Sequence, residues 1–376
     1  MKKRHAAPLS LTILGALALA GCSTDAPDSE SVGGSGALSA CPATVVLQTN
    51  WFPEPEHAAA YQLIDPATAT IDSDAGIYSG PAIADDSVTI EVRAGGPFIG
   101  FQSSTALLYS DDSIMLAMID TDESVKLSAD QPTTAIFTPF QTTPQALFFD
   151  PEKFDFESFA DVGKSDATVQ YFEGATYMSY LVAEGLIRED QIDGSFDGSV
   201  TRLVAGEDVV MQGYITQEPW RLKNEFTEFG RDVGTLLVSE SGYDIYPSVW
   251  AGRPEIIDSE SECLGQLVPA LQQAQVDYMD SPEAVNEAIS DYLAEIAQFF
   301  QISPEFAADI TKVMAGDGMV VNGVDGVMGS FEPERMERMT EKLVDVFTGV
   351  GVDTAEGLTA EDVYTNEFLD ASISLP

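Results

Sequence analysis

The chain has 376 residues, 44% of them hydrophobic, and its 62 acidic against 17 basic residues give a formal net charge of −45. This balance all but excludes nucleic acid as a partner, because binding it requires Lys and Arg side chains that neutralise phosphates. The length suggests about two domains, and the hydrophobic content is sufficient for packed cores. The acidic residues are scattered rather than gathered in one tail, which is typical of a solvated surface.

The N-terminus has the layout of a secretory signal peptide. Residues 2–4 are basic, an apolar run follows at 9–20, and Leu-Ala-Gly-Cys ends it at Cys22. This run is too short for a transmembrane helix, so we predict a signal peptide over residues 1–21. Leu-Ala-Gly-Cys is similar to a bacterial lipobox. The similarity implies cleavage before Cys22 and a diacylglycerol group on its sulfur.

A flexible tether is predicted after the cleavage site. Residues 22–42, the lipidated N-terminus and tether, are mostly small and polar and rich in Gly and Ser, a composition typical of linkers. No later stretch approaches the roughly 18 apolar residues that a membrane span needs. The rest of the chain is therefore expected outside the cytoplasm, held to the outer face of a bacterial cell membrane by its lipid anchor only.

The first part of the body alternates strands with helices. A β-branched run at 44–49 predicts a strand, and the small residues at 57–64 predict a helix. Further strands are predicted at 87–92, 113–119 and 133–137, with a helix at 102–109. Segment 65–86 has no periodicity and is expected to be a loop or a strand-poor insertion. Strands that alternate with helices at this spacing indicate βαβ units and a parallel sheet.

A second series of strands and helices begins near residue 150. Its strands are predicted at 167–170, 208–214, 235–238 and 245–250, and a helix is predicted within 171–187. The last third is almost purely helical, with helices predicted at 264–279, 283–300, 304–315 and 333–348. Start signals such as Ser-Pro-Glu, with proline in the first turn, precede them.

The organisation that follows is α/β, with two lobes in sequence and a helical C-terminal part. Residues 43–140 are expected to form the first part of lobe 1, and residues 141–240 are expected to form lobe 2. Residues 241–376 are expected to return to lobe 1 and to supply the C-terminal helices.

Two cysteines remain after lipidation. Cys41 and Cys263 are the only cysteines of the exported body, and in an exported chain two such cysteines most simply form a disulfide. A metal site would need more thiols or histidines, and His57 is the only histidine beyond the signal peptide. No metal is therefore expected.

Sequence motifs for catalysis are missing. The chain contains neither a P-loop nor a Gly-x-Ser-x-Gly elbow. With one histidine and no free thiol, Ser-His and Cys-His chemistry is limited to what His57 could support. Carboxylate pairs are so numerous that a glycosidase-like pair would arise by chance. The sequence therefore argues against an enzyme, and no cofactor is expected.

Aromatic and polar residues follow three predicted strands directly. These stretches are Asn50-Trp51, Tyr171-Phe172-Glu173-Gly174 and Gln217-Glu218-Pro219-Trp220. In open α/β sheets, ligands bind outside the carboxyl ends of the strands. Aromatic rings there offer flat apolar surface, and Asn and Glu offer hydrogen bonds that orient a ligand. Packing of the same aromatic residues in the core is the alternative.

The opening stretch VVLQTNWFPEPEHAAAYQL (45–63) resembles the solute-binding proteins related to thiamine-pyrimidine precursor binders. In that family a strand runs into Asp/Asn-Trp, then into a Pro-x-x-x-His turn, and then into a helix of small residues. Three further stretches resemble family segments in the same order, namely YFEGATYM (171–178), LVAGEDVVMQGYITQEP (203–219) and TNEFLD (365–370). The resemblance covers most of residues 43–370, with poor matches at 65–86 and 260–330.

The resemblance implies a two-lobe periplasmic-binding-protein fold, type II-like, in which each lobe is a mostly parallel sheet flanked by helices. It also implies a substrate-binding lipoprotein that closes on a small heteroaromatic ligand, a thiamine-pyrimidine precursor or a flavin-like molecule, and delivers it to an ABC transporter permease. A monomer is expected. Trp51 would stack on the ring, Asn50 would hydrogen-bond it, and Glu218 would reach its edge from the second lobe. The candidate ligand-binding residues are Asn50, Trp51, His57, Tyr171, Glu173, Gly174, Tyr177, Glu218 and Trp220.

Two other ligand or reaction classes stay open. A small anion such as a sulfonate would require Arg or Lys at the strand ends, and Arg93 is the nearest cation to a candidate loop. A pyrimidine-synthase-like enzyme would require a lysine in the cleft, where Lys126, Lys153 and Lys164 are the choices. The cysteine-rich motif of such enzymes is missing. For His57, capping or core packing is as plausible as ligand contact. A surface-interaction lipoprotein without a small ligand is the third possibility.

Overall fold

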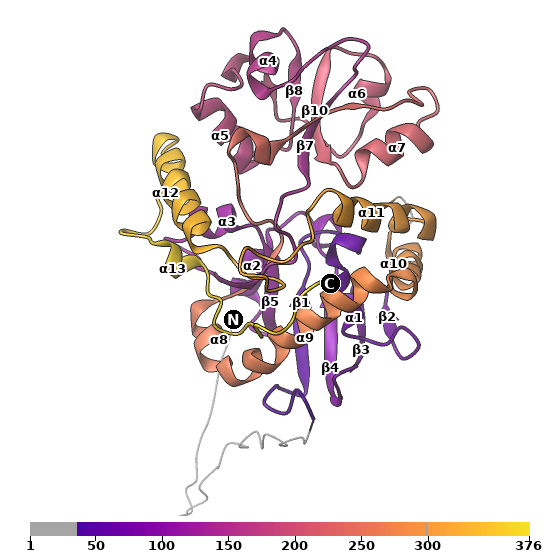
Figure 1. Ribbon diagram of the computed structural model, residues 1–376, viewed down its shortest axis with the longest axis vertical. Helices are drawn as coiled ribbons and strands as arrows, with labels where there is room; N and C mark the ends of the chain where they lie inside the picture. Colours follow the sequence, from indigo (N-terminus) through magenta and orange to yellow (C-terminus); the bar gives the residue numbers. More distant parts are fainter. Residues whose placement is uncertain (1–35, 298–299) are drawn as a thin grey trace, which may run out of the picture. The chain divides into compact units, whose positions relative to one another are not determined.

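A computed structural model describes residues 36–297 and 300–376, which belong to one compact unit (Figure 1). The predicted signal peptide over 1–21, the predicted lipidation site Cys22 and the predicted tether up to residue 35 lie outside the described residues. None of the helices in the described ranges combines the length and the apolar character that a membrane span requires.

The last part of the predicted tether is packed instead of free. Leu38 is 1% exposed, and its N–H donates to Asp85 Oδ2 at 3.2 Å. The N–H of Ala40 donates to Gln266 Oε1 at 3.0 Å. The tether prediction is therefore wrong for residues 36–42, because the Leu38 side chain, two hydrogen bonds from backbone N–H groups and the Cys41–Cys263 link hold this turn against the body.

The larger sheet has seven strands in the order β2-β3-β4-β1-β5-β12-β6. Strand β1 pairs in parallel with both β4 and β5, whereas the other neighbours pair antiparallel. The sheet is therefore mixed, with a parallel centre. All six residues of β5 are buried. The strands are β1 (Thr44–Gln48), β2 (Thr70–Asp72), β3 (Ile77–Ala82), β4 (Asp85–Arg93), β5 (Ile114–Ile119), β6 (Thr134–Phe137) and β12 (Val249–Gly252).

The smaller sheet has five strands in the order β11-β7-β10-β8-β9. Strand β8 pairs in parallel with β10 and β9, and β7 pairs antiparallel with β10 and β11. This sheet is mixed as well, because β7 runs against the direction of the other four strands. The strands are β7 (Gln145–Phe149), β8 (Thr168–Gln170), β9 (Ile192–Asp193), β10 (Val209–Tyr214) and β11 (Gly234–Leu237).

Segment 65–86 is not the strand-poor insertion that its lack of periodicity predicted. It contains β2 and β3, which extend the larger sheet beyond β4. The turn between them is set by Asp72, whose Oδ1 accepts hydrogen bonds from the N–H groups of Asp74 and Ala75, and by Gly76 at a φ of 65°. Strand β2 alternates only between half-buried and exposed residues, so no apolar period marks it.

Helices lie around both sheets (Figure 1). The larger sheet is accompanied by α1 (Ala58–Gln62), α2 (Ser104–Ser110), α3 (Thr121–Lys126), α8 (Pro254–Ser259) and α13 (Ala360–Val363). The smaller sheet is accompanied by α4 (Phe159–Lys164), α5 (Thr176–Ala183), α6 (Thr201–Val204) and α7 (Glu218–Asn224). Four short 3₁₀ helices are η1 (Pro55–His57), η2 (Gly96–Ile99), η3 (Glu189–Gln191) and η4 (Val238–Ser241).

The helical C-terminal part is confirmed. It consists of α9 (Ser261–Asp280), α10 (Glu283–Ile296), α11 (Pro304–Gly316) and α12 (Pro333–Gly349). Helix α11 shows the local reason for its start, because the Ser303 side chain accepts the N–H of Phe306 and Pro304 occupies the first turn. The Sγ atoms of Cys41 and Cys263 lie 2.05 Å apart, which places the residues before β1 directly on α9.

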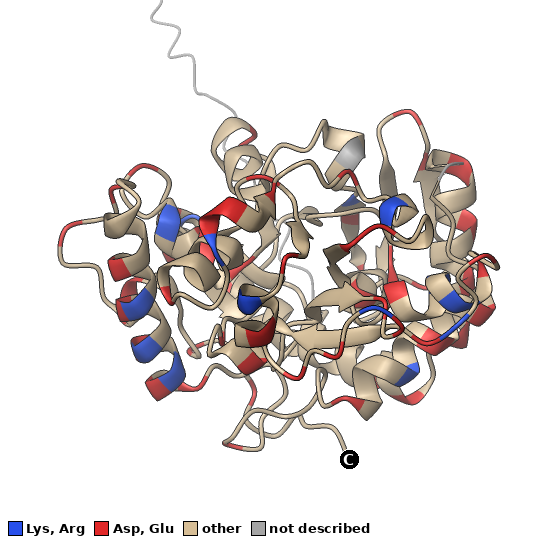
Figure 2. Ribbon diagram, turned by 90° about the horizontal axis from the view of Figure 1, so that it is seen from above, with Lys and Arg blue, Asp and Glu red and all other residues tan. Residues whose placement is uncertain are grey.

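Acidic residues are spread over the helices and loops of the body, and basic residues are few (Figure 2). The ion pairs that do form lie mostly at the surface, as between Arg93 and Asp111 at 2.8 Å or between Arg253 and Asp112 at 2.8 Å. Such exposed pairs contribute about 0–1 kcal/mol each. The hydrophobic cores therefore dominate stability, with Trp250 of β12 fully buried in the largest of them.

Candidate functional site

A cavity of about 970 Å³ opens where strands of both sheets end. The residues after β1, β5, β8 and β10 line it, and so do the residues just before β7 and β12. Strands β7 and β12 are antiparallel to β10 and β5, so their starts lie beside the carboxyl ends of those strands. The volume falls at the upper end of the roughly 300–1,000 Å³ that is usual for small-molecule sites.

Aromatic rings from both sheets meet at Trp51. Its ring centroid lies 6.4 Å from that of Phe172, which follows β8 of the smaller sheet, and 5.9 Å from that of Phe101. Gly96 leaves the space that the indole occupies, because a Cβ there would lie 2.7 Å from Trp51 Cε3. The N–H of Gly95 donates to the Trp51 carbonyl at 2.8 Å and holds the loop. Trp51 therefore has a defined position beside the cavity.

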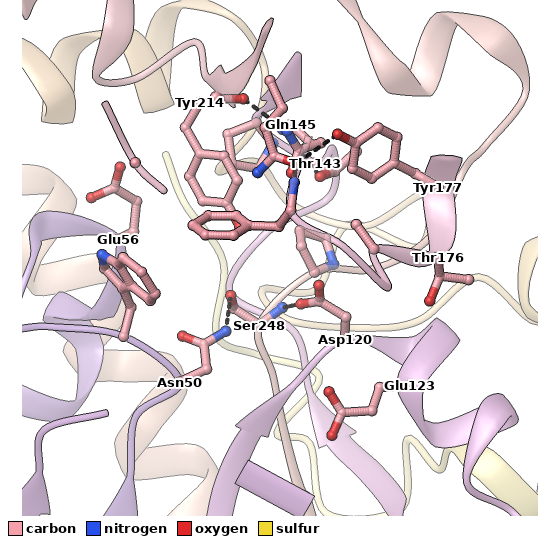
Figure 3. A pocket seen from close by; sticks show the side chains of 18 of the residues that line it. Asn50, Glu56, Asp120, Glu123, Thr143, Gln145, Thr176, Tyr177, Tyr214 and Ser248 are labelled. Carbon is pink, nitrogen blue, oxygen red and sulfur yellow. Dashed lines mark hydrogen bonds between the residues drawn. The ribbon is translucent and has the colours of Figure 1, made fainter. Parts of the chain in front are cut away.

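Two hydrogen bonds in the cavity join the residue after β1, the residue before β12 and the residue after β5 (Figure 3). The Asn50 amide donates to Ser248 Oγ at 3.1 Å, and the Ser248 N–H donates to Asp120 Oδ1 at 2.7 Å. Ser248 adopts a φ of 48°, a conformation that costs a non-glycine residue free energy. The two hydrogen bonds therefore fix the Asn50 side chain in one orientation.

Three carboxylates after β5 form a cluster that we call the β5 acidic group, Asp120, Asp122 and Glu123. Burial raises the pKa of Asp120 to about 7, and the charges of Asp122 and Glu123 raise it too, against the Ser248 hydrogen bond. Burial also raises the pKa of Glu123, whose Oε1 accepts a hydrogen bond from Thr105 at 2.5 Å. Asp122 Oδ2 accepts the hydroxyl of Tyr243 at 2.6 Å.

Three glutamates form a second cluster, the glutamate group, Glu54, Glu56 and Glu218. The Gln217 amide joins Glu54 and Glu56, with distances of 2.8 Å to Glu54 Oε2 and 3.3 Å to Glu56 Oε1. Burial raises the pKa of Glu54 well above its ordinary value, and the charge of Glu56 raises it further. Burial also raises the pKa of Glu56. Two adjacent buried carboxyls thus disfavour ionisation of each other.

Glu218 lies at the start of α7, beside the end of β10. Its Oε2 accepts the N–H of Tyr214, and a Cβ at Gly213 would lie 2.5 Å from its carboxyl carbon. Gly213 therefore makes room for the carboxyl. Burial raises the pKa of Glu218 to about 7, although the Tyr214 N–H and the charge of Arg221 lower it.

The smaller sheet contributes a polar anchor at Gln212. Its Oε1 accepts hydrogen bonds from the Phe172 N–H at 2.8 Å and from the Tyr177 hydroxyl at 2.7 Å. Gln145 donates to the Gly213 carbonyl at 3.0 Å. These bonds fix the loop after β8, so the aromatic ring of Phe172 faces Trp51 from a supported position.

Five of the sequence-predicted residues line the cavity, namely Asn50, Trp51, Gly174, Tyr177 and Glu218. Tyr171 and Glu173 lie in the same loop but outside the lining, and the Glu173 side chain is exposed. Trp220 turns away from the cavity and stacks on Phe306 of α11, with ring centroids 4.2 Å apart.

His57 lies behind the cavity instead of in its lining. It is 1% exposed, and its Nε2 is 3.5 Å from Glu54 Oε1. Burial lowers its pKa to about 3, so the imidazole is neutral at physiological pH. The structure thus places His57 as a buried support of the η1 turn that carries Glu54 and Glu56.

Several lining residues were missed by sequence reasoning, and some could have been found. Asp120, Asp122 and Glu123 follow a correctly predicted strand, so the rule that identified Asn50 and Trp51 applies to them equally. Glu54 and Glu56 stand within the quoted opening stretch. In contrast, residues 143–144 and 243–248 carry no such signal, because they precede β7 and β12. The strand predicted at 245–250 begins only at Val249.

Within the described ranges, no group of three or more His, Cys, Asp or Glu side chains is arranged to hold a metal ion. The acidic side chains of the cavity therefore do not form a metal centre of that size.

No family model matches the sequence, and a search of curated proteins finds no match. Among solved structures, the fold is similar to that of the alkanesulfonate-binding protein SsuA from Xanthomonas axonopodis pv. citri bound to MOPS, with a TM-score of 0.54, 10% identity and coverage of 86% of this chain and 99% of that one. It is also similar to the periplasmic aliphatic sulphonate binding protein SsuA from Escherichia coli, with a TM-score of 0.53, 9% identity and coverage of 82% and 88%. A third similar structure is the ligand-binding component of an ABC-type import system from Staphylococcus aureus with zinc bound, with a TM-score of 0.52, 11% identity and coverage of 88% and 100%. The predicted two-lobe periplasmic-binding-protein fold is confirmed, with sheets that are mixed in their strand pairing.

Proposed function

We propose that this protein is the extracytoplasmic substrate-binding component of an ABC importer and that its cleft binds a small heteroaromatic ligand. The observation that supports this most is the position of Trp51, whose ring meets Phe172 of the other sheet at 6.4 Å beside a cavity of about 970 Å³. A ring bound there would contact both sheets, so binding would favour the closed arrangement that a permease recognises.

The proposal includes the location and division of the chain. The lipid on Cys22 would anchor the protein to the outer face of the membrane, and residues 43–140 with 241–376 would form one lobe and 141–240 the other. The protein would act as a monomer that binds without catalysis.

Native mass spectrometry of freshly purified full-length protein tests the proposal directly. We expect a retained small molecule with heteroaromatic ultraviolet absorbance, which denaturation should release. A thermal-shift panel of aminopyrimidines and flavins complements it, with stabilisation expected for at least one compound. If the protein retains no molecule and the panel leaves its melting temperature unchanged, a surface-interaction role without a small ligand is favoured instead.

A small anion is the second candidate ligand. Two of the similar structures are sulfonate-binding proteins, and Lys126 and Arg221 supply cationic side chains to the lining. Under this alternative an alkanesulfonate should raise the melting temperature more than any heteroaromatic compound does. We expect the opposite, because a sulfonate would enter a cavity whose other charged side chains are all acidic.

A further inference from the structure

The lining of the cleft is strongly acidic. Among the residues that the structure describes, it contains seven carboxylates and, opposed to them, only two cationic side chains, Lys126 and Arg221. The carboxylates are Glu54, Glu56, Asp120, Asp122, Glu123, Asp197 and Glu218. Burial raises the pKa of five of these groups, so an anionic ligand would either be repelled by them or require them to stay protonated, and both cost free energy in a partly desolvated site.

The two cations have contacts of their own, although Arg221 Nε has no hydrogen-bond partner among the described residues. The Arg221 Nε atom lies 3.6 Å from Glu225 outside the cavity, and the guanidinium carbon lies 4.9 Å from the ring centre of Phe300. Lys126 Nζ is 3.5 Å from the Gly174 carbonyl. Within the described ranges, none of the seven carboxylates lies within 4.0 Å of a Lys or Arg nitrogen, and the one histidine pair, between Glu54 and the neutral His57, adds no positive charge.

The two acidic clusters act on one shared space. Burial raises the pKa of Tyr214 well above its ordinary value, and the charges of Asp120, Glu54, Glu56 and Glu218 raise it further. The Tyr214 hydroxyl therefore lies within the field of carboxylates from both sheets. A small ligand next to this ring would lie near Asp120 of one cluster and near the three glutamates of the other.

Two carboxylate oxygens of these clusters have no hydrogen-bond partner among the described residues, although the Thr216 hydroxyl lies near enough to the Glu56 carboxyl to lower its pKa. They are Oε2 of Glu56, which is 4% exposed, and Oδ1 of Asp122, which is 7% exposed. Both side chains line the cavity, and Figure 3 shows the Glu56 carboxyl beside it. A buried oxygen without a donor is costly. Ligand N–H groups are the donors that would satisfy these oxygens.

The rest of the lining favours an organic cation over an inorganic one. Ten of its side chains are aromatic, Trp51 and Tyr214 among them. Aromatic faces attract cations with a diffuse, weakly hydrated charge, and no metal-binding group of three was found within the described ranges. We propose that the cleft binds a planar organic cation, whose ring lies against Trp51 and whose protonated nitrogens donate to Glu56 and Asp122. This inference rests on the proposed function and specifies that the ligand is positively charged.

A set of three ring compounds of nearly equal size and different charge tests the inference. Benzamidine is cationic, benzamide is neutral and benzoate is anionic, and each is titrated into purified full-length protein by calorimetry. We expect benzamidine to bind at least about tenfold more tightly than benzamide, because a hydrogen bond to a charged group is worth more than a neutral one. Benzoate should bind most weakly.

Two variants assign the charge recognition to the named carboxylates. Glu56→Gln and Asp122→Asn should each reduce the preference for benzamidine over benzamide by about tenfold and leave benzamide affinity nearly unchanged. Glu305→Gln is the matched control, since Glu305 is an exposed carboxylate on α11 outside the cavity. It should change neither affinity.

The outcomes separate this inference from the proposed function. Suppose that the three compounds bind equally, or that benzoate binds best, and that Trp51→Ala abolishes this binding. The cleft then binds aromatic rings, but the cation inference is overturned. If zinc or calcium chloride stabilises the protein and benzamidine does not, an inorganic cation is the ligand and the inference is likewise overturned. If no ring compound binds, the proposed heteroaromatic site fails along with it.

Discussion

Replacement of Trp51 by alanine is expected to separate ligand affinity from folding stability. A ring that stacks on the indole gains about 0.5–1.5 kcal/mol beyond burial, and the apolar area hidden between the two rings adds about 25 cal/mol for each Å². Together these exceed about 1.4 kcal/mol, so benzamidine affinity should fall at least about tenfold. Trp51 is only half-buried and contacts the ring of Phe101 beside the cavity. The free energy of unfolding should therefore fall much less than the binding free energy.

The assay is calorimetric titration together with urea unfolding of the same variant. Trp250→Ala supplies the contrast, because Trp250 is 0% exposed in the core and its truncation should cost about 3–5 kcal/mol of unfolding free energy. The reasoning is refuted if Trp51→Ala keeps its affinity for every ring compound while its urea midpoint falls as far as that of Trp250→Ala. Trp51 would then be a packing residue.

Three further predictions concern the disulfide, the pH and the loop beside the tryptophan. Free-thiol labelling of the unfolded, unreduced protein should find Cys41 and Cys263 unreactive, and reduction should cost about 4–5 kcal/mol in the chain-entropy model; two reactive thiols would contradict the pairing. Asp120 and Glu218 have pKa values raised to about 7, whereas in the unfolded chain they ionise near 4. Stability without ligand should therefore fall as the pH rises from about 4 to 7. Benzamidine affinity should rise between about pH 6 and 8, the window in which both groups ionise in the folded protein. Benzamidine affinity that does not change between pH 5 and 8 would remove these two carboxylates from recognition. Gly96→Ala should weaken ring binding and lower the melting temperature, since Gly96 has a φ of 61° and its Cβ would meet the indole at 2.7 Å; an unchanged titration would show that the loop can shift.

Local sequence signals were sufficient for the parallel centre of the larger sheet and for the C-terminal helices. The strand predicted at 113–119 is β5, and the helix predicted at 304–315 is α11, with its Ser303 cap and Pro304 start. These elements are defined by buried apolar runs or by capping residues, both of which are properties of neighbouring residues. Strand β2 is different, because its partly exposed residues are held only by pairing with β3.

The residues of the site also divide into those that local sequence signals identify and those that only strand pairing brings in. The rule that ligands gather at carboxyl ends of strands led to Asn50, Trp51 and Glu218, and it would have led to Asp120. It could not lead to Ser248, because the start of a strand joins the site only when that strand is antiparallel, and the pairing of β12 with β5 is decided between segments far apart in the sequence.

The sequence also did not determine the direction in which a side chain points. Trp51 and Trp220 both follow strand ends, yet the first lines the cavity and the second stacks on Phe306 of a C-terminal helix. Which aromatic residue is available to a ligand depends on what the rest of the chain places against it.

The sequence by itself determined that the protein is acidic, that its body is α/β with a helical end, and that aromatic residues follow its strands. It could not show which of 62 acidic residues matter, because charge alone does not distinguish a solvated carboxylate from a buried one. Only the tertiary structure brought Glu56 and Asp122 into one cavity, each with an oxygen that no described residue satisfies. A desolvated oxygen without a donor gains the most from a ligand N–H group, and desolvation exists only once the chain has folded around these carboxylates.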